Sequence, residues 1–168
     1  SGQSKYQIIV ESIEISGEGA LLKLFEERKR KFLKLGYFEN NQKQRLPFLP
    51  RSLAIITSKS GAVIQDMINR VLDRFPLKIY LFSVSVQGIN SSNEISNAIK
   101  KINKLKSDKI LHDVDIIIIA RGGGSVEDLW GFNEENVIIS TFESKIPIIS
   151  AIGHETDVTL IDYVADLR

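Results

Sequence analysis

Two apolar runs that both end at a glycine turn decide the fold of this chain: DIIIIARGGGSVEDLWGFN, Asp115–Asn133, and KIPIISAIGHETD, Lys145–Asp157. Each run begins with a segment that has the length and β-branched content of a buried strand. The first turn carries an arginine, three glycines and a serine. The second carries a histidine, a glutamate and an aspartate. These are polar groups suited to phosphate chemistry, so the pair of turns predicts a functional site as well as a fold.

Strands and helices alternate along the chain from Arg51 onward. The expected strands cover residues 53–57, 78–86, 114–120 and 146–152, and the expected helices cover residues 62–75, 93–105, 133–143 and 156–167. The third strand is apolar on both faces, which indicates a central position in a parallel sheet. The pattern predicts an α/β fold, with an open, mainly parallel sheet and helices on both faces in a Rossmann-like, three-layer arrangement.

A strand and a helix are expected before this unit. Tyr6–Ile15 is rich in β-branched residues. Ala20–Leu35 is an amphipathic helix that Gly36 is expected to end, and its apolar stripe consists of Leu21, Leu22, Phe25, Phe32 and Leu33. We therefore expect three parts: an N-terminal segment over 1–15, a connecting helix and loop over 16–50, and an α/β domain over 51–168.

Composition excludes several classes of protein. The 168 residues include no cysteine, so disulfides and thiolate metal sites are excluded and a reducing cytoplasm is expected. No apolar run approaches the roughly 20 residues of a membrane span. The net charge of +1 does not by itself indicate a nucleic-acid binder. Basic clusters at 28–31 and 100–109 are interpreted as solvated helix faces.

Three polar residues follow the carboxyl ends of expected strands. Asp66 lies early in the helix after the first strand, Arg121 follows the third strand, and His154 follows the fourth. Ligands of open parallel sheets bind at this edge, where the loops between strands and helices gather. The topology therefore predicts that these side chains share one site.

The turn Gly122–Ser125 has the character of an anion-binding turn. Glycines allow close backbone approach and positive φ, and Ser125 with Asp128 has the spacing of a capping box that begins a short helix. The spacing fits neither the dinucleotide fingerprint nor the P-loop. The alternatives are an ordinary tight turn and, for Arg121, a structural ion pair with an acidic neighbour, Asp115, Glu127 or Asp128.

His154 could act as a base, an acid or a nucleophile near neutral pH, with Asp157 orienting its ring. Two histidines and no metal-binding motif argue against zinc. A magnesium site made by Asp66, Glu155 and Asp157 stays open. Asp66 could instead pair with Arg70, four residues further along the same helix.

Hydroxyl and aromatic groups complete the set of candidates. Ser58 and Ser60 could cap the following helix, contact phosphate, or do both. Trp130 and Phe132 could stack on bases or pack in the core.

The motifs together resemble those of the exonuclease VII large-subunit family. The matching segments are TSKSGAVIQD at 57–66, PLKIYLFSVSVQG at 76–88, ARGGGSVEDLWGFN at 120–133, IPIISAIGHETDVTLIDYVADLR at 146–168, and the region from Tyr6 to Phe32. The resemblance covers nearly the whole chain, and RGGGSxEDLWxFN together with GHETD is highly specific.

The resemblance implies hydrolysis of single-stranded DNA from either end to short oligonucleotides, with no divalent metal and no cofactor. Its essential residues carry over onto Asp66, Arg121, His154 and Asp157. It also implies a longer protein, in which residues 1–15 are the tail of an OB-fold and a C-terminal helical region, outside this chain, binds a small subunit. This chain would then be the central catalytic domain.

We expect these four residues to be catalytic and the phosphate to be held by a second group: Ser58, Ser60, Gly122, Gly123, Gly124 and Ser125. The expected partners are single-stranded DNA and the small subunit of the full protein, with no membrane. Two alternatives remain, a non-catalytic nucleotide- or nucleic-acid-binding module and a magnesium-dependent nuclease.

Overall fold

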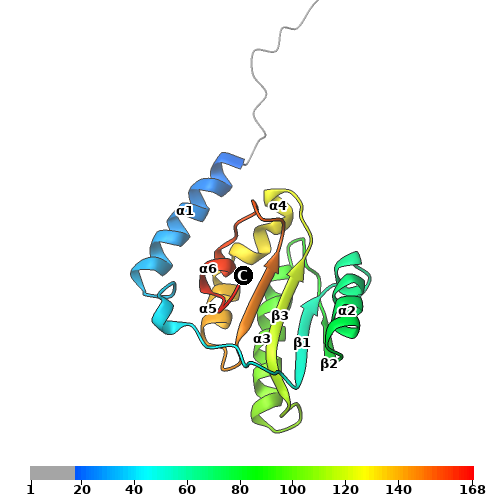
Figure 1. The fold of residues 1–168 in the computed structure, drawn as a ribbon. Helices are drawn as coiled ribbons and strands as arrows, with labels where there is room; N and C mark the ends of the chain where they lie inside the picture. The colour runs from blue at the N-terminus through cyan, green and yellow to red at the C-terminus, as the bar shows by residue number, and fades with distance from the viewer. Residues whose placement is uncertain (1–17) are drawn as a thin grey trace, which may run out of the picture.

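The computed structural model of this chain describes residues 18–168 and shows a four-stranded parallel sheet with the strand order β2-β1-β3-β4 (Figure 1). The expected strand at Tyr6–Ile15 lies outside the described residues. The strands are β1 (Ser52–Thr57), β2 (Lys78–Ser83), β3 (Val114–Arg121) and β4 (Ile148–Ile152). The helices are α1 (Glu18–Lys34), α2 (Ala62–Arg74), α3 (Ser91–Ser107), α4 (Val126–Leu129), α5 (Glu135–Phe142) and α6 (Leu160–Val164), with short 3₁₀ turns η1 (Asn40–Gln42) and η2 (Trp130–Asn133).

The strand order places a topological switch point between β1 and β3. The chain leaves β1 through α2 to reach β2 on one side, and it returns through α3 to reach β3 on the other side of β1. Ligands of such sheets bind outside the carboxyl ends of the strands at this point. The loops that follow β1 and β3 flank the switch point, and the loop after β4 lies beside them.

Helices cover both faces of the sheet, as the sequence predicts. On one face, Ala54, Ile56, Ile117 and Ile119 pack against Ile99 and its helical neighbours in α3 and α5. On the other face, the alternate positions of β1 and β3 are buried toward α2. β3 is central and buried on both faces, which confirms its predicted position. No helix within residues 18–168 has the length and apolar character that crossing a membrane requires.

Helix α1 packs outside α5 and α6 rather than on the sheet (Figure 1). Phe32 is its buried anchor, and Gly36, with φ +78°, ends it in the predicted place. The basic cluster at 28–31 is only partly a solvated face. Arg28 pairs with Glu134 at 3.0 Å and Lys31 pairs with Glu135 at 2.6 Å, so the cluster also docks α1. Leu22 and Leu33, both predicted to face inward, are exposed.

The predicted starts of α5 and α6, and the predicted cap of α2, differ from the structure. Residue 133 does not begin α5, because the Asn133 side chain accepts a hydrogen bond from Leu160 N–H at 2.7 Å. α6 begins at Leu160 rather than at 156, because Thr159 and Asp162 form a capping box. Gly61, and neither Ser58 nor Ser60, is the N-cap of α2, and it makes no side-chain cap hydrogen bond.

Candidate active site

The turns that follow β3 and β4 are joined through the backbone. Gly153 N–H donates to the carbonyl oxygen of Arg121 at 2.9 Å, where the two strands end. Gly153 has φ +67°, a conformation that favours glycine. A Cβ at this position would also stand 2.8 Å from Oδ2 of Asp157. The two motifs singled out in the sequence therefore form one local structure.

The imidazole of His154 lies directly against Gly123. A Cβ at Gly123 would come closer than 3.0 Å to the Cε1 and Nδ1 atoms of the ring, a distance that real Cβ atoms essentially never show. Among the described glycines, positive φ values occur at Gly36, Gly88 and Gly153, so the prediction of positive φ for the glycine triplet is wrong. At Gly123 the His154 ring occupies the space that a side chain would fill, so a larger residue there would displace the ring.

Asp157 holds the histidine in this position. Its Oδ2 accepts a hydrogen bond from the backbone N–H of His154 at 2.9 Å and lies 3.4 Å from Nδ1 of the ring. The backbone hydrogen bond from His154, helped by charge attraction to the His154 ring and to Arg168, holds the pKa of the Asp157 carboxyl below its usual value. The carboxylate is therefore ionised at neutral pH, and it lies beside Nδ1, so Nε2 is the ring nitrogen that Asp157 does not contact.

Arg121 is buried and is directed toward its own turn. Its guanidinium donates to the carbonyls of Gly122 and Gly123 and, at 2.9 Å, to Oε1 of Gln87. Asp128 lies 3.5 Å from it, which is one of the ion pairs that the sequence left open. A Cβ at Gly124 would collide with the guanidinium. The third glycine is therefore needed for Arg121, just as the second is needed for His154.

The turn presents three free backbone donors. The N–H groups of Gly123, Gly124 and Ser125 have no hydrogen-bond acceptor among residues 18–168. In a trans peptide the N–H points away from the carbonyl of the preceding residue. Since the carbonyls of Gly122 and Gly123 face Arg121, the next two N–H groups face the opposite way. Successive amide groups that face one side of a turn are donors of the kind that suits an anion.

Ser125 begins α4 as predicted. Its side chain accepts a hydrogen bond from Asp128 N–H at 3.3 Å, which is one half of the expected capping box. The carboxylate of Asp128 completes no reciprocal bond, because it pairs with Arg121. The cap therefore fixes the end of the turn while the acid supports the guanidinium.

Asp66 lies on the neighbouring helix, at the other side of the switch point. One turn before it, the side chain of Val63 would stand 3.5 Å from a Cβ at Gly122, so α2 borders the glycine turn. The exposed carboxylate of Asp66 pairs with Arg70 at 3.2 Å, the alternative that the i,i+4 spacing suggested. The structure brings Arg121, His154 and Asp157 into one contact network, and Asp66 lies outside that network.

The structure does not assemble the magnesium set. Within residues 18–168, no group of three or more His, Asp or Glu side chains is arranged to share a metal ion. Asp66 is held by Arg70, and Asp157 is held by His154. Of the two candidate hydroxyls, Ser58 is half-buried beside Gly61 and Ser60 is exposed.

Sequence reasoning missed two residues that support the site. Gln87 accepts from Arg121, and Arg168 donates to the carbonyls of His154, Glu155 and Asp157 at 3.2, 3.3 and 2.6 Å. Gln87 lies in the loop after β2, so it follows the carboxyl end of a predicted strand at the same edge as Arg121 and His154. This position could have identified it from the sequence. Arg168 is eleven or more residues away in sequence from the carbonyls it binds, and no local pattern marks it.

Comparison with known proteins connects this geometry to one family. The sequence profile described as "Exonuclease VII, large subunit" matches residues 37–168. Proteins named exodeoxyribonuclease 7 large subunit from Bartonella henselae and Agrobacterium fabrum are 52% and 51% identical over 99% of this chain. The chain spans 35% and 31% of the length of these relatives.

Structural likeness adds nothing to this result. An ornithine carbamoyltransferase from Burkholderia thailandensis superposes on 80% of this chain and 39% of its own, with a TM-score of 0.36 and 18% identity, too weak to support an inference. The sequence match carries the assignment: the chain belongs to the exonuclease VII large-subunit family.

Proposed function

We propose that this chain carries the catalytic site of an enzyme that hydrolyses phosphodiester bonds of single-stranded DNA from its ends and releases short oligonucleotides. The relatives' name supports the class of reaction. The observation that carries the proposal is the packing of the His154 ring against Gly123, beside three unpaired backbone N–H groups. An imidazole and a turn with free N–H donors lie next to each other at a switch point of the sheet, which supports a site that binds and cleaves a phosphodiester.

Cleavage of a phosphodiester needs a group that binds the charged oxygens, an activated nucleophile and a proton for the leaving oxygen. The N–H groups of Gly123, Gly124 and Ser125 would hold the phosphate oxygens. Nε2 of His154 would then act in one of two ways. As a base it would take a proton from the water that attacks phosphorus and pass that proton to the leaving oxygen. As a covalent nucleophile it would attack phosphorus and displace the leaving oxygen, with Asp66 taking part in the proton transfer. Asp157 would keep the ring oriented and stabilise its charged form.

Arg121 enters the proposal as the group that shapes the turn. Its guanidinium holds the carbonyls of Gly122 and Gly123, and its positive charge lies directly behind the proposed phosphate position. Asp66 enters through the family resemblance alone, as a group that positions water or takes part in proton transfer once it is released from Arg70. Ser58 lies at the same edge and would contact phosphate from the β1 side.

Metal independence is part of the proposal, because the carboxylates that would bind magnesium are engaged separately. The full protein would act in the cytoplasm together with its small subunit. Cleavage by the full assembly in excess chelator is the direct check. Activity that disappears with chelator and returns with magnesium would contradict a metal-free reaction.

The central test replaces His154 with alanine in the full-length protein, assembled with its small subunit. Loss of a general base or nucleophile is expected to lower the cleavage rate roughly 10²–10⁴-fold, with DNA binding retained. His112 provides the matched control. It is the chain's other histidine, is exposed, and precedes β3, so it lies at the opposite edge of the sheet. Normal cleavage by His154→Ala would refute the assignment, and phosphate binding without any cleavage by the unaltered assembly would favour a binding module.

A further inference from the structure

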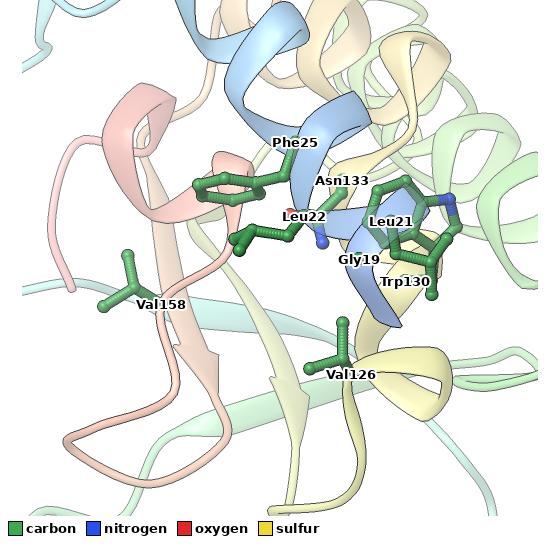
Figure 2. A pocket seen from close by; sticks show the side chains of 8 residues that line it. All are labelled: Gly19, Leu21, Leu22, Phe25, Val126, Trp130, Asn133 and Val158. Atoms are coloured by element: carbon green, nitrogen blue, oxygen red, sulfur yellow. The ribbon is translucent and has the colours of Figure 1, made fainter. Parts of the chain in front are cut away.

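An apolar pocket of about 450 Å³ lies between α1, α4 and the loop before α6 (Figure 2). Its volume falls within the roughly 300–1,000 Å³ of small-molecule sites. Leu22, Phe25, Val126 and Val158 supply most of the apolar wall, and Trp130 supplies an aromatic side chain. None of the residues lining the pocket in the described part of the chain is charged. The pocket is therefore suited to a flat, uncharged group rather than to a phosphate.

The pocket is continuous with the candidate active site. A second hollow, of about 240 Å³, shares Val126, Asn133 and Val158 with it. This second hollow extends to Gly124 and Asp157, which belong to the two joined turns. A ligand in the apolar pocket would consequently lie next to a phosphate bound at the glycine turn.

One polar group in the pocket is prepared to bind a ligand. Asn133 is only 4% exposed, and its Oδ1 is fixed by the hydrogen bond from Leu160 N–H at 2.7 Å. Its Nδ2 has no acceptor among residues 18–168, and Figure 2 shows this nitrogen pointing into the space between Leu22, Val126 and Val158. Nδ2 is not among the fully buried atoms without a partner, so it is a donor that a ligand in the pocket can reach.

We propose that this pocket holds a base of the DNA strand, next to the phosphate at the glycine turn. The inference rests on the proposed function and adds a binding site for the base to it. The apolar wall would cover the faces of the base, and Nδ2 of Asn133 would donate to a ring nitrogen or carbonyl acceptor. Every base carries such an acceptor on its minor-groove edge, so the site would hold the strand with little sequence preference.

Two leucines of α1 provide a matched test. Leu22 lines the pocket and is 63% exposed, whereas Leu33 lies outside its lining and is 59% exposed. Glutamate at either position adds the same charge to the same helix at an exposed place. The variants Leu22→Glu and Leu33→Glu are made in the full-length protein assembled with its small subunit and carrying His154→Ala, so that DNA is bound without being cut. Affinity is measured with an oligothymidylate and with an abasic strand of the same length.

The proposal expects Leu22→Glu to weaken oligothymidylate binding roughly tenfold, in line with the contribution of one stacked base, while Leu33→Glu binds as the parent does. With the abasic strand the two variants should bind equally, because no base is present to enter the pocket. An equal loss on both strands would mean charge repulsion of the backbone and would overturn the proposal.

Loss of the small subunit in Leu22→Glu alone, seen as a smaller particle in light scattering, would also overturn it, since a protein segment would then occupy the pocket. Cleavage by the His154→Ala variant tests the proposed function separately, so failure of that function can be distinguished from failure of the proposed base-binding pocket.

Discussion

Replacement of Gly123 by alanine should move the His154 ring and lower the cleavage rate, while the stability of the fold changes little. The new Cβ would stand closer than 3.0 Å to the imidazole, whereas ordinary contact begins at 3.4 Å. The ring must therefore move by about 1 Å, a displacement that can lower catalysis roughly 10²-fold. The His154 side chain is 79% exposed, so it can move into solvent with little cost to folding. Backbone φ is not positive at Gly123, so alanine itself is allowed there.

The two neighbouring glycines are the controls. At Gly122 a Cβ would meet Val63 at 3.5 Å, an ordinary contact, and Gly122→Ala should retain near-normal cleavage and stability. At Gly124 a Cβ would displace the buried guanidinium of Arg121, so Gly124→Ala should also lower the melting temperature. The assay combines cleavage of single-stranded DNA by the full-length assembly with thermal unfolding of the 168-residue chain. Full activity in Gly123→Ala would show that the observed position of His154 is not needed for the reaction.

Two further predictions follow from other contacts. Arg168→Ala should lower kcat for DNA cleavage about tenfold with KM little changed, because it frees the carbonyls of the His154 turn. Arg168→Lys should recover part of this loss. An unchanged kcat together with an unchanged pH–rate profile would refute the positioning role of Arg168. A hydrogen bond from Arg51 holds the pKa of Asp115 below its usual value, so Asp115 stabilises the fold fully above about pH 4 and loses this effect as the pH falls through its depressed pKa. Urea denaturation between neutral and acid pH should therefore show a shallower acid decline in Asp115→Asn than in the parent, and parallel curves would contradict the argument.

Local patterns in the sequence determine most of the fold. Each expected strand from 53 onward is present, because runs such as Ile116–Ile119 leave no other way to bury so many β-branched side chains. The errors occur where a distant group decides a boundary. The side chain of Asn133 reaches Leu160, 27 residues away, and so does not cap the adjacent helix. Leu22 was expected in the core because periodicity alone cannot show whether an apolar stripe has a partner.

The sequence predicted that the polar residues of the candidate site lie at one edge of the sheet, but it did not predict how their side chains are arranged. Parallel topology correctly placed Arg121 and His154 at one edge, and their turns are in contact. The expected positive φ of the glycine triplet was wrong, since two of these glycines make room for side chains rather than for unusual backbone angles. The direction of the Arg121 guanidinium could not be inferred either. It depends on Gln87, which follows a different strand, and sequence spacing does not report such a contact.

The hydrogen bond between Gly153 and Arg121 has a consequence for the evolution of this family. It ties the two turns together through main-chain atoms, so their separation does not depend on which side chains they carry. The fit of the His154 ring against Gly123 does depend on side chains, and it leaves no space for an added methyl group. Mutational drift at one turn is thus constrained by the other. Homologues that carry a larger residue at position 123 should also have replaced the imidazole at position 154, and such lineages should have lost the activity proposed here.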